Sequence, residues 1–365
     1  MQYILERGNY SMSQLQKVRG ALQKQQTEAL IITNDQNRRY LTGFTGSAGT
    51  VVITPTKSML LVDFRYTEQA TKQSRAFEVR QIERAHLYET IQEIFDAESI
   101  QTVGFEQQHV SYYTYQLMAS KLTATLKPLS NIVKDLRMIK TPKEIELIKK
   151  AAWISDEAFQ HILTFIKPGV SEIDIANELE AHMRKNGATG AAFDMIIASG
   201  KRSALPHGVA TDKIVEQGDM LTLDFGAYYQ GYRSDMTRTI AVGEPPEKLK
   251  EIYQIVYNSL QHALMHMKAG ITGKEADSYS RDFITSKGYG EHYGHGSGHG
   301  IGLDIHENIF MSTVCEDLLE ENMVLTVEPG IYIADLGGVR IEDDVIITKD
   351  GIEIITHSPK ELIIL

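Results

Sequence analysis

The hydrophobic pattern in the first third of the chain alternates between short apolar runs and amphipathic segments. An amphipathic helix is expected over residues 12–26, and apolar strands follow at 29–33, 50–54 and 58–66. The alternation continues to about residue 133 and predicts an α/β unit around a largely buried sheet. The glycines near the first strands form neither GxGxxG nor GxxxxGK[ST]. We therefore expect no phosphate-binding loop and no chemistry of its own in this part.

The pattern becomes more helical at residues 134–140, where we place a domain boundary. Thr141 with Glu144 three residues later predicts the capped start of a long helix. The chain therefore divides into an N-terminal α/β domain, 1–134, and an α+β domain, 135–365, with helices around an antiparallel sheet. Helices of the second domain are expected at about 141–166, 171–187, 246–268 and 273–287.

One predicted hairpin in the second domain carries two aspartates. Residues 221–225 alternate apolar and polar side chains, as in a half-buried strand, and the alternation resumes at Asp235. We centre the hairpin between Tyr229 and Gln230. Asp224 then lies directly opposite Asp235, with the Cβ atoms about 5 Å apart. By itself, this pair is better explained as two solvated aspartates on a polar face.

A second predicted hairpin repeats this arrangement with glutamates. Glu328 and Glu342 flank a connection centred on Asp335, so they face each other across the hairpin. Like charges at this separation repel, and each pair destabilises the fold unless a cation compensates it. Two such pairs are hard to explain as solvated surface, and together they predict a cation site.

Histidines between the two hairpins add a second ligand type: His292, His295, His299 and His306. Neutral imidazole together with carboxylates suits manganese, iron, cobalt or zinc. Four carboxylates and one imidazole are too few for two separate closed sites, but they suffice for two ions bridged by shared carboxylates and a water. Any single histidine is better explained as a satisfied polar group, and we interpret His292 in this way.

Composition narrows the class of protein. The formal net charge of −11 argues against a general nucleic-acid surface, which needs clustered Lys and Arg. No run of about 18 apolar residues occurs, so neither a transmembrane helix nor a membrane partner is expected. The single cysteine, Cys315, fits a reducing cytoplasm, and a packed side chain explains it better than a nucleophile does. No signal peptide is recognisable; Met12 is an alternative start that would make residues 1–11 a leader.

Five of these side chains stand in contexts that resemble the metal ligands of the methionine aminopeptidase/prolidase family: Asp224 (LDFG), Asp235 (YRSDMTRT), His299 (GHGIGLDIHE), Glu328 (TVEPGIYI) and Glu342 (VRIEDD). Their separations of 11, 64, 29 and 14 residues match the prolidase and aminopeptidase P branch closely. In the N-terminal domain, YLTGFTGSAG and DFRYTEQA resemble motifs of bacterial Xaa-Pro peptidases. The resemblance implies the pita-bread fold over 135–365 and two divalent metal ions, with manganese expected and cobalt, zinc or iron as alternatives.

The resemblance also implies a role for each ligand. Asp224 chelates one ion, while Asp235 and Glu342 bridge both. His299 and Glu328 complete the first site. A water that bridges two cations has a lowered pKa and can attack the scissile carbonyl as hydroxide near neutral pH. Glu328 is expected to accept its proton and to deliver it to the proline nitrogen, as general base and then general acid.

Four further residues match positions around the family's pocket. His207 and His306 are expected to hold the substrate carbonyl or to stabilise the tetrahedral oxyanion. His295 matches a residue at the border of the pocket, although a loop histidine with only local hydrogen bonds explains it equally well. Arg340 lies on the same strand face as Glu342 and is expected to orient carboxylates.

The expected activity is hydrolysis of the bond between an N-terminal residue and a following proline, as a dipeptidase, an aminopeptidase P or both. The alternative is a non-catalytic peptide-binding module on the same fold, which the intact ligand set opposes; a creatinase lacks these ligands. Prolidases specialised for dipeptides commonly place a basic residue in the stretch that matches 307–327, to pair with the carboxylate of the substrate. This stretch contains no Lys or Arg here, which favours longer peptides unless another loop or subunit supplies the charge. Asn322 replaces a frequent glycine and tolerates a left-handed backbone. A homodimer is expected from the resemblance alone.

Overall fold

The computed structural model describes residues 2–365, and of residues 2–12 the backbone alone. The suggested leader, residues 1–11, falls on this stretch, so Met1 and the side chains up to Met12 lie outside the described residues. The chain forms two compact units, Met1–Arg137 and Met138–Leu365. Among the described residues, none of the helices is both long and apolar enough to cross a membrane.

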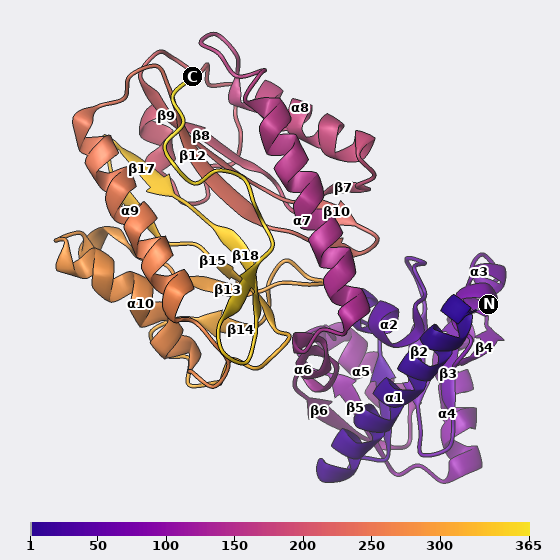
Figure 1. The fold of residues 1–365 in the computed structure, drawn as a ribbon. Coiled ribbons are helices and arrows are strands. Elements are labelled where there is room, and N and C mark those ends of the chain that lie inside the picture. The colour runs from indigo at the N-terminus through magenta and orange to yellow at the C-terminus, as the bar shows by residue number, and fades with distance from the viewer. Residues whose placement is uncertain (1) are drawn as a thin grey trace. The chain divides into compact units, whose positions relative to one another are not determined.

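The first unit is built on a mixed sheet in the order β4-β3-β2-β1-β5-β6 (Figure 1). β1 runs antiparallel to β2 and parallel to β5, and both β1 and β2 are fully buried, as their apolar runs predict. The first helix begins well before the expected residue 12. The strands are β1 (Ala29–Ile32), β2 (Thr50–Ile53), β3 (Ser58–Val62), β4 (Glu78–Gln81), β5 (Thr102–Glu106) and β6 (Thr125–Leu129). The helices are α1 (Gln2–Lys24), α2 (Asp35–Thr42), α3 (Thr67–Gln73), α4 (Leu87–Glu98), α5 (Tyr112–Lys121) and α6 (Ile132–Met138).

Two pairs of helices pack on the strands of the second unit. α7 (Pro142–Ile162) contacts α8 (Glu172–Lys185), and α9 (Glu247–His266) contacts α10 (Gly273–Ser286). Figure 1 shows the strands between the two pairs. Thr141 caps α7 in a reciprocal capping box with Glu144, as predicted, because each side chain satisfies a backbone N–H that has no partner within the helix. α7 ends at Ile162, about four residues earlier than expected.

The strands of the second unit form antiparallel sheets in the orders β12-β9-β8, β14-β13-β15-β18-β19, β11-β10-β7 and β16-β17. Helices packed around antiparallel strands confirm the predicted α+β class. The strands are β7 (Gly190–Ala191), β8 (Ile196–Ser199), β9 (Asp219–Phe225), β10 (Ala227–Tyr229), β11 (Tyr232–Arg233), β12 (Met236–Val242), β13 (Gly298–Gly300), β14 (Glu307–Met311), β15 (Val324–Val327), β16 (Gly330–Ile333), β17 (Gly337–Arg340), β18 (Asp343–Ile347) and β19 (Ile352–Ile354).

The register of the aspartate hairpin differs from the predicted one. β9 pairs with β12 so that Asp224 lies opposite Thr237, and the expected direct pairing of Asp224 with Asp235 is wrong. The turn falls on Gln230 and Gly231, which both have positive φ (46° and 91°), as a type I′ turn requires. The hairpin is therefore centred one residue later than expected. Because side chains alternate along a strand, Asp235 still shares a face with Thr237.

The glutamate hairpin has the predicted register. β16 pairs with β17 around Asp335, whose φ of 63° is left-handed. The pairing of β15 with β18 continues the same register, with Val327 opposite Asp343. The next pair in this register is Glu328 with Glu342. Asn322 has a φ of 68°, so it takes the left-handed conformation that asparagine tolerates.

Candidate metal centre

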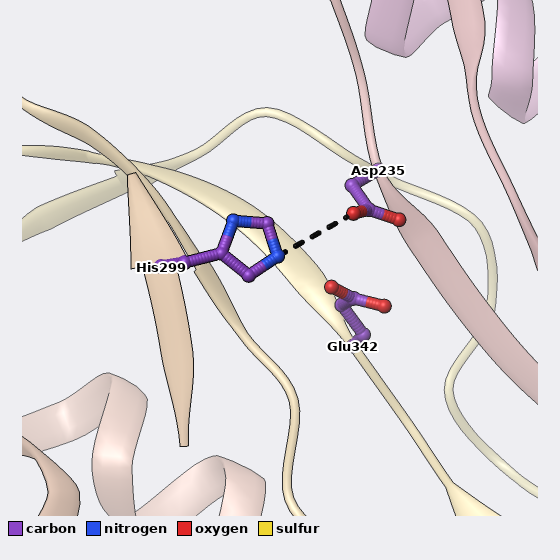
Figure 2. A group of neighbouring side chains, drawn as sticks. All are labelled: Asp235, His299 and Glu342. Carbon is purple, nitrogen blue, oxygen red and sulfur yellow. Dashed lines mark ion pairs between the residues drawn. The ribbon is translucent and has the colours of Figure 1, made fainter. Parts of the chain in front are cut away.

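Asp235, His299 and Glu342 converge in the second unit from distant parts of the chain. Asp235 precedes β12, His299 is the central residue of β13, and Glu342 lies between β17 and β18. Each offers one ligand atom, and these atoms all lie within 4.8 Å of one another (Figure 2). All three residues are more than nine-tenths buried. Two carboxylates and an imidazole gathered away from water form a candidate site for a divalent cation.

His299 is oriented for ligation by its own strand. Its Nδ1 donates to the carbonyl of Gly300 at 3.0 Å, which leaves the lone pair of Nε2 facing the carboxylates. Nε2 lies 3.7 Å from Asp235 Oδ2, along the dashed line in Figure 2, and 3.5 Å from Glu328 Oε1. Burial lowers the pKa of His299 to about 4, so the ring is neutral at neutral pH and suited to a metal.

The buried carboxylates disfavour one another's charges. Burial raises the pKa of Asp235 well above its ordinary value, and the charges of Glu342 and Asp224 raise it further. The pKa of Glu342 is also raised well above its ordinary value, first by burial and then by the charges of Glu328 and Asp224. Burial also raises the pKa of Glu328 to about 7. A divalent cation would oppose these shifts, because it favours the ionised carboxylates.

Two buried oxygens test whether this donor set suits a cation. Oδ1 of Asp224 and Oδ1 of Asp235 are shielded from water and have no hydrogen-bond donor among the described residues. A buried carboxylate oxygen without a partner destabilises a fold, whereas coordination to a cation would satisfy it. The residues therefore fit a divalent metal ion.

Arg340, which is 3% exposed, connects Asp224 to the rest of the cluster. Its Nη2 donates to Asp224 Oδ2 at 2.5 Å, and its Nη1 donates to the hydroxyl of Tyr332 at 2.7 Å. Its Nε donates to Thr237 Oγ1 at 3.2 Å, and Thr237 in turn donates to Glu342 Oε2 at 2.5 Å. Arg340 thus contacts Asp224 directly and Glu342 through one hydroxyl.

Tyr332 and Thr237 are members of this network that the sequence analysis did not identify. The hydroxyl of Tyr332 lies 2.9 Å from Nε2 of His295, so it links that ring to the guanidinium. Strand alternation is the signal that would have found both residues. Thr237 comes two residues after Asp235, and Tyr332 is four residues after Glu328, so each shares a strand face with a predicted ligand.

Three of the predicted histidines surround the cluster. The exposed ring of His306 packs edge-to-face on His299, with 4.4 Å between the ring centroids. His295 Nδ1 lies 4.0 Å from Glu328, and burial lowers the pKa of His295 to about 4. The ring of His306 is only partly shielded, and this partial burial lowers its pKa; the next contribution comes from His207, an exposed loop residue. His292 lies apart from this group, in a short 3₁₀ helix with its ring near Tyr289.

Both units match known sequence families. The model of metallopeptidase family M24 matches residues 146–349, which include the five predicted ligands. The model of the creatinase/prolidase N-terminal domain matches residues 14–139. The two matches together cover most of the chain.

Individual relatives cover nearly the whole chain. The Xaa-Pro dipeptidase of Pyrococcus horikoshii is 41% identical over 351 residues, which are 96% of this chain and 98% of that protein. The solved structure of an Xaa-Pro dipeptidase from Bacillus anthracis has a TM-score of 0.96 at 51% identity, covering 97% of this chain and 100% of that one. The X-Pro aminopeptidase from Thermotoga maritima MSB8 has a TM-score of 0.89 at 40% identity, covering 96% and 99%.

Proposed function

The chain belongs to metallopeptidase family M24, and from this premise we propose that it hydrolyses the bond between an N-terminal residue and a following proline. The observation that carries the proposal is the buried cluster of Asp235, His299 and Glu342, whose ligand atoms lie within 4.8 Å of one another. The similar proteins named Xaa-Pro dipeptidase and X-Pro aminopeptidase support the choice of proline-containing peptides as substrates.

We propose that the site holds two divalent ions, with manganese as the expected metal. Members of the family use divalent metals, and the buried Oδ1 atoms of Asp224 and Asp235 support a site that binds cations. Asp235 and Glu342 would be shared between the ions, and Asp224, His299 and Glu328 would complete the coordination. Bound ions would supply Lewis acidity and would lower the pKa of a water molecule between them.

Glu328 is suited to transfer the proton in this reaction. Its carboxylate lies inside the cluster, with Oε1 3.5 Å from His299 Nε2, so it would be next to a metal-bound water and could exchange a proton with it. It would therefore take the proton of the attacking water and pass it to the nitrogen of the leaving proline.

The histidines and Arg340 would position the reacting groups. The exposed rings of His306 and His207 would donate to the substrate carbonyl oxygen as negative charge develops on it. His295, Tyr332 and Arg340 form a continuous hydrogen-bonded chain that would keep Asp224 oriented toward the metal.

Substrate length divides the proposal into two forms. The absence of Lys and Arg from residues 307–327 favours longer peptides over dipeptides. The similar proteins are named both as a dipeptidase and as an aminopeptidase.

We also propose a homodimer that works in the cytoplasm, which light scattering and cell fractionation would test.

Peptide hydrolysis with and without metal tests the proposal. The full chain, stripped with a chelator and reloaded with Mn²⁺, should cleave Gly-Pro or a longer Xaa-Pro-Xaa peptide, and it should leave the matched peptides with alanine in place of proline intact. Cleavage of the longer peptide alone would identify an aminopeptidase. Absence of cleavage by protein with bound metal would contradict the proposal and favour the peptide-binding module.

A further inference from the structure

Residues 301–306 form the loop that carries His306 from β13 to β14. Its ring is largely exposed and packs edge-to-face on His299, so the position of His306 depends largely on the loop backbone. The residues at the base of the loop are buried, beginning with Ile301 at 0% exposure. Whatever fixes this backbone therefore also fixes where the imidazole of His306 lies.

The carboxylate of Glu307, at the end of the loop, holds the loop from inside. Its Oε1 accepts hydrogen bonds from the backbone N–H groups of Leu303 at 3.0 Å and Asp304 at 3.3 Å. Gly302 packs directly against the same group, since a Cβ at this position would lie 2.8 Å from Oε2. The loop thus wraps around one side chain, and Gly302 leaves the space that the carboxylate needs.

Lys140 balances the charge of this carboxylate. Its Nζ lies 3.0 Å from Glu307 Oε2, and the two side chains are only 2% and 4% exposed. The backbone N–H of Lys140 donates to the carbonyl of Asn322 at 2.9 Å, which fixes the lysine to the second unit. Removing one partner of such a pair leaves a buried charge without compensation, which is strongly unfavourable.

The opposite side of the loop is bound to the aspartate hairpin. The backbone N–H of Arg233 donates to the carbonyl of Gly302 at 2.9 Å, and its Nε donates to the carbonyl of Leu303 at 3.2 Å. Arg233 lies two residues before Asp235. The loop is therefore held on its N–H side by Glu307 and on its carbonyl side by the strand that leads to the candidate metal centre.

We propose that the buried Lys140–Glu307 ion pair is a positioning device that holds the 301–306 loop, so that His306 faces the substrate carbonyl. The inference rests on the proposed function, because it assigns the effect on catalysis to His306. Neither Lys140 nor Glu307 touches the substrate or a metal; both act through the loop.

The first test is Glu307→Gln in the full chain loaded with Mn²⁺. Glutamine has the same shape and still accepts a backbone hydrogen bond, but it leaves Lys140 buried without a negative charge. We expect kcat to fall by about 10-fold to 100-fold, as when a residue that orients a ligand is lost, with unchanged metal content. Hydrogen exchange should become faster in the peptide containing Leu303 and Asp304. Unchanged exchange or unchanged kcat would overturn the inference.

The second test separates positioning from a general structural role. His306→Ala should lower kcat on its own, and adding Glu307→Gln to that variant should lower it further by less than about 2-fold, because residues that act as a unit have non-additive effects. Equal losses from Glu307→Gln with and without His306 would overturn the positioning role. If His306→Ala leaves kcat unchanged, the role proposed for His306 fails first, and the exchange experiment still reports on the loop.

The lysine provides a matched pair of variants. Lys140→Met should reproduce the effects of Glu307→Gln, and the double variant, which leaves no buried charge, should recover stability and part of kcat. Ile162→Ala, a fully buried change in α7, controls for destabilisation: it should lower Tm and leave kcat and loop exchange unchanged. If the double variant has a Tm and a kcat no higher than those of the single variants, the assigned pairing of Lys140 with Glu307 is overturned.

Discussion

The two units bury different kinds of side chain. In the first unit, the central strands β1 and β2 bury chiefly Leu, Ile and Val. In the second, Asp224 lies within β9, Asp235 precedes β12 and Glu342 lies between β17 and β18, and all three are more than nine-tenths buried. Among the described residues, every acidic side chain buried to this extent belongs to the second unit. The sheet of the first unit makes an apolar core, whereas the sheets of the second unit bury carboxylates that destabilise the fold and form a candidate cation site.

The buried carboxylates are therefore the groups whose negative charge must be balanced in the second unit. Ionised carboxylates buried side by side are unfavourable unless a cation or proton compensates them. The first unit should therefore respond little to metal and pH, and the second unit should respond strongly. Each prediction below tests this contrast, beginning with the largest effect.

Asp235→Asn should separate activity from stability. We expect kcat/KM to fall by about 1000-fold, the scale for groups that stabilise charge in the transition state, because the carboxylate proposed to bind both ions is lost. The metal-free variant should unfold at a higher temperature than metal-free wild type, since asparagine needs neither a buried negative charge nor the uptake of a proton on folding. Peptide assays and calorimetry measure both. Asp350→Asn, an exposed carboxylate in a turn, is the matched control and should change neither.

Metal should stabilise one unit and not the other. Mn²⁺ at about 100 times its dissociation constant should stabilise the folded protein by about 2.7 kcal/mol. Hydrogen exchange should slow in β9, β12 and β18 and stay unchanged in β1 and β2, which serve as the internal control. Equal slowing in both units, or in neither, would contradict the assignment of the cation site.

Metal binding should release protons. The raised pKa values of Asp235 and Glu342, and that of Glu328 at about 7, mean that these groups hold protons below neutral pH and must lose them to bind a cation. Apparent affinity should therefore rise from pH 6 to pH 8. His299, with a pKa of about 4, is already neutral and should contribute nothing to this rise.

Calorimetry in buffers with different ionisation enthalpies measures the released protons. At pH 6.5 we expect at least about one proton per molecule. An affinity that is constant or falls as pH increases would contradict the assignment of these carboxylates as ligands.

Tyr332→Phe should produce the smallest effect. It removes the hydroxyl that links His295 to Arg340, so Asp224 would lose part of its orientation while every ligand remains. We expect about a 10-fold loss in metal affinity or kcat. Tyr229→Phe, which removes a hydroxyl that accepts a hydrogen bond from Gln230 at the hairpin turn, should leave both unchanged. Metal titration and peptide assays distinguish the two variants.

Local patterns predicted the strands but only part of their pairing. Alternation located both hairpins, and the glutamate register was confirmed because its connection is symmetric around Asp335. The predicted register of the aspartate hairpin was wrong, because the position of its turn depends on which residues accept positive φ. Gly231 indicates this conformation, but Gln230 does so only weakly.

The network around the candidate ligands depends on contacts that no local pattern contains. Arg340 was expected beside Glu342, yet its guanidinium reaches Asp224, 116 positions away in sequence. Lys140 and Glu307 are 167 positions apart and meet only once the fold brings them together. Strand alternation could have indicated Thr237, since it needs only the period of the strand and the position of Asp235.

The two-residue turn at Gln230 and Gly231 also limits how this protein can vary. A strand presents successive side chains to opposite faces, so one inserted or deleted residue in this turn would exchange the faces of β12. Asp235 and Thr237 would then point away from Asp224, although the composition of the loop had hardly changed. Among related proteins, the length of this turn should therefore vary less than the identity of its residues.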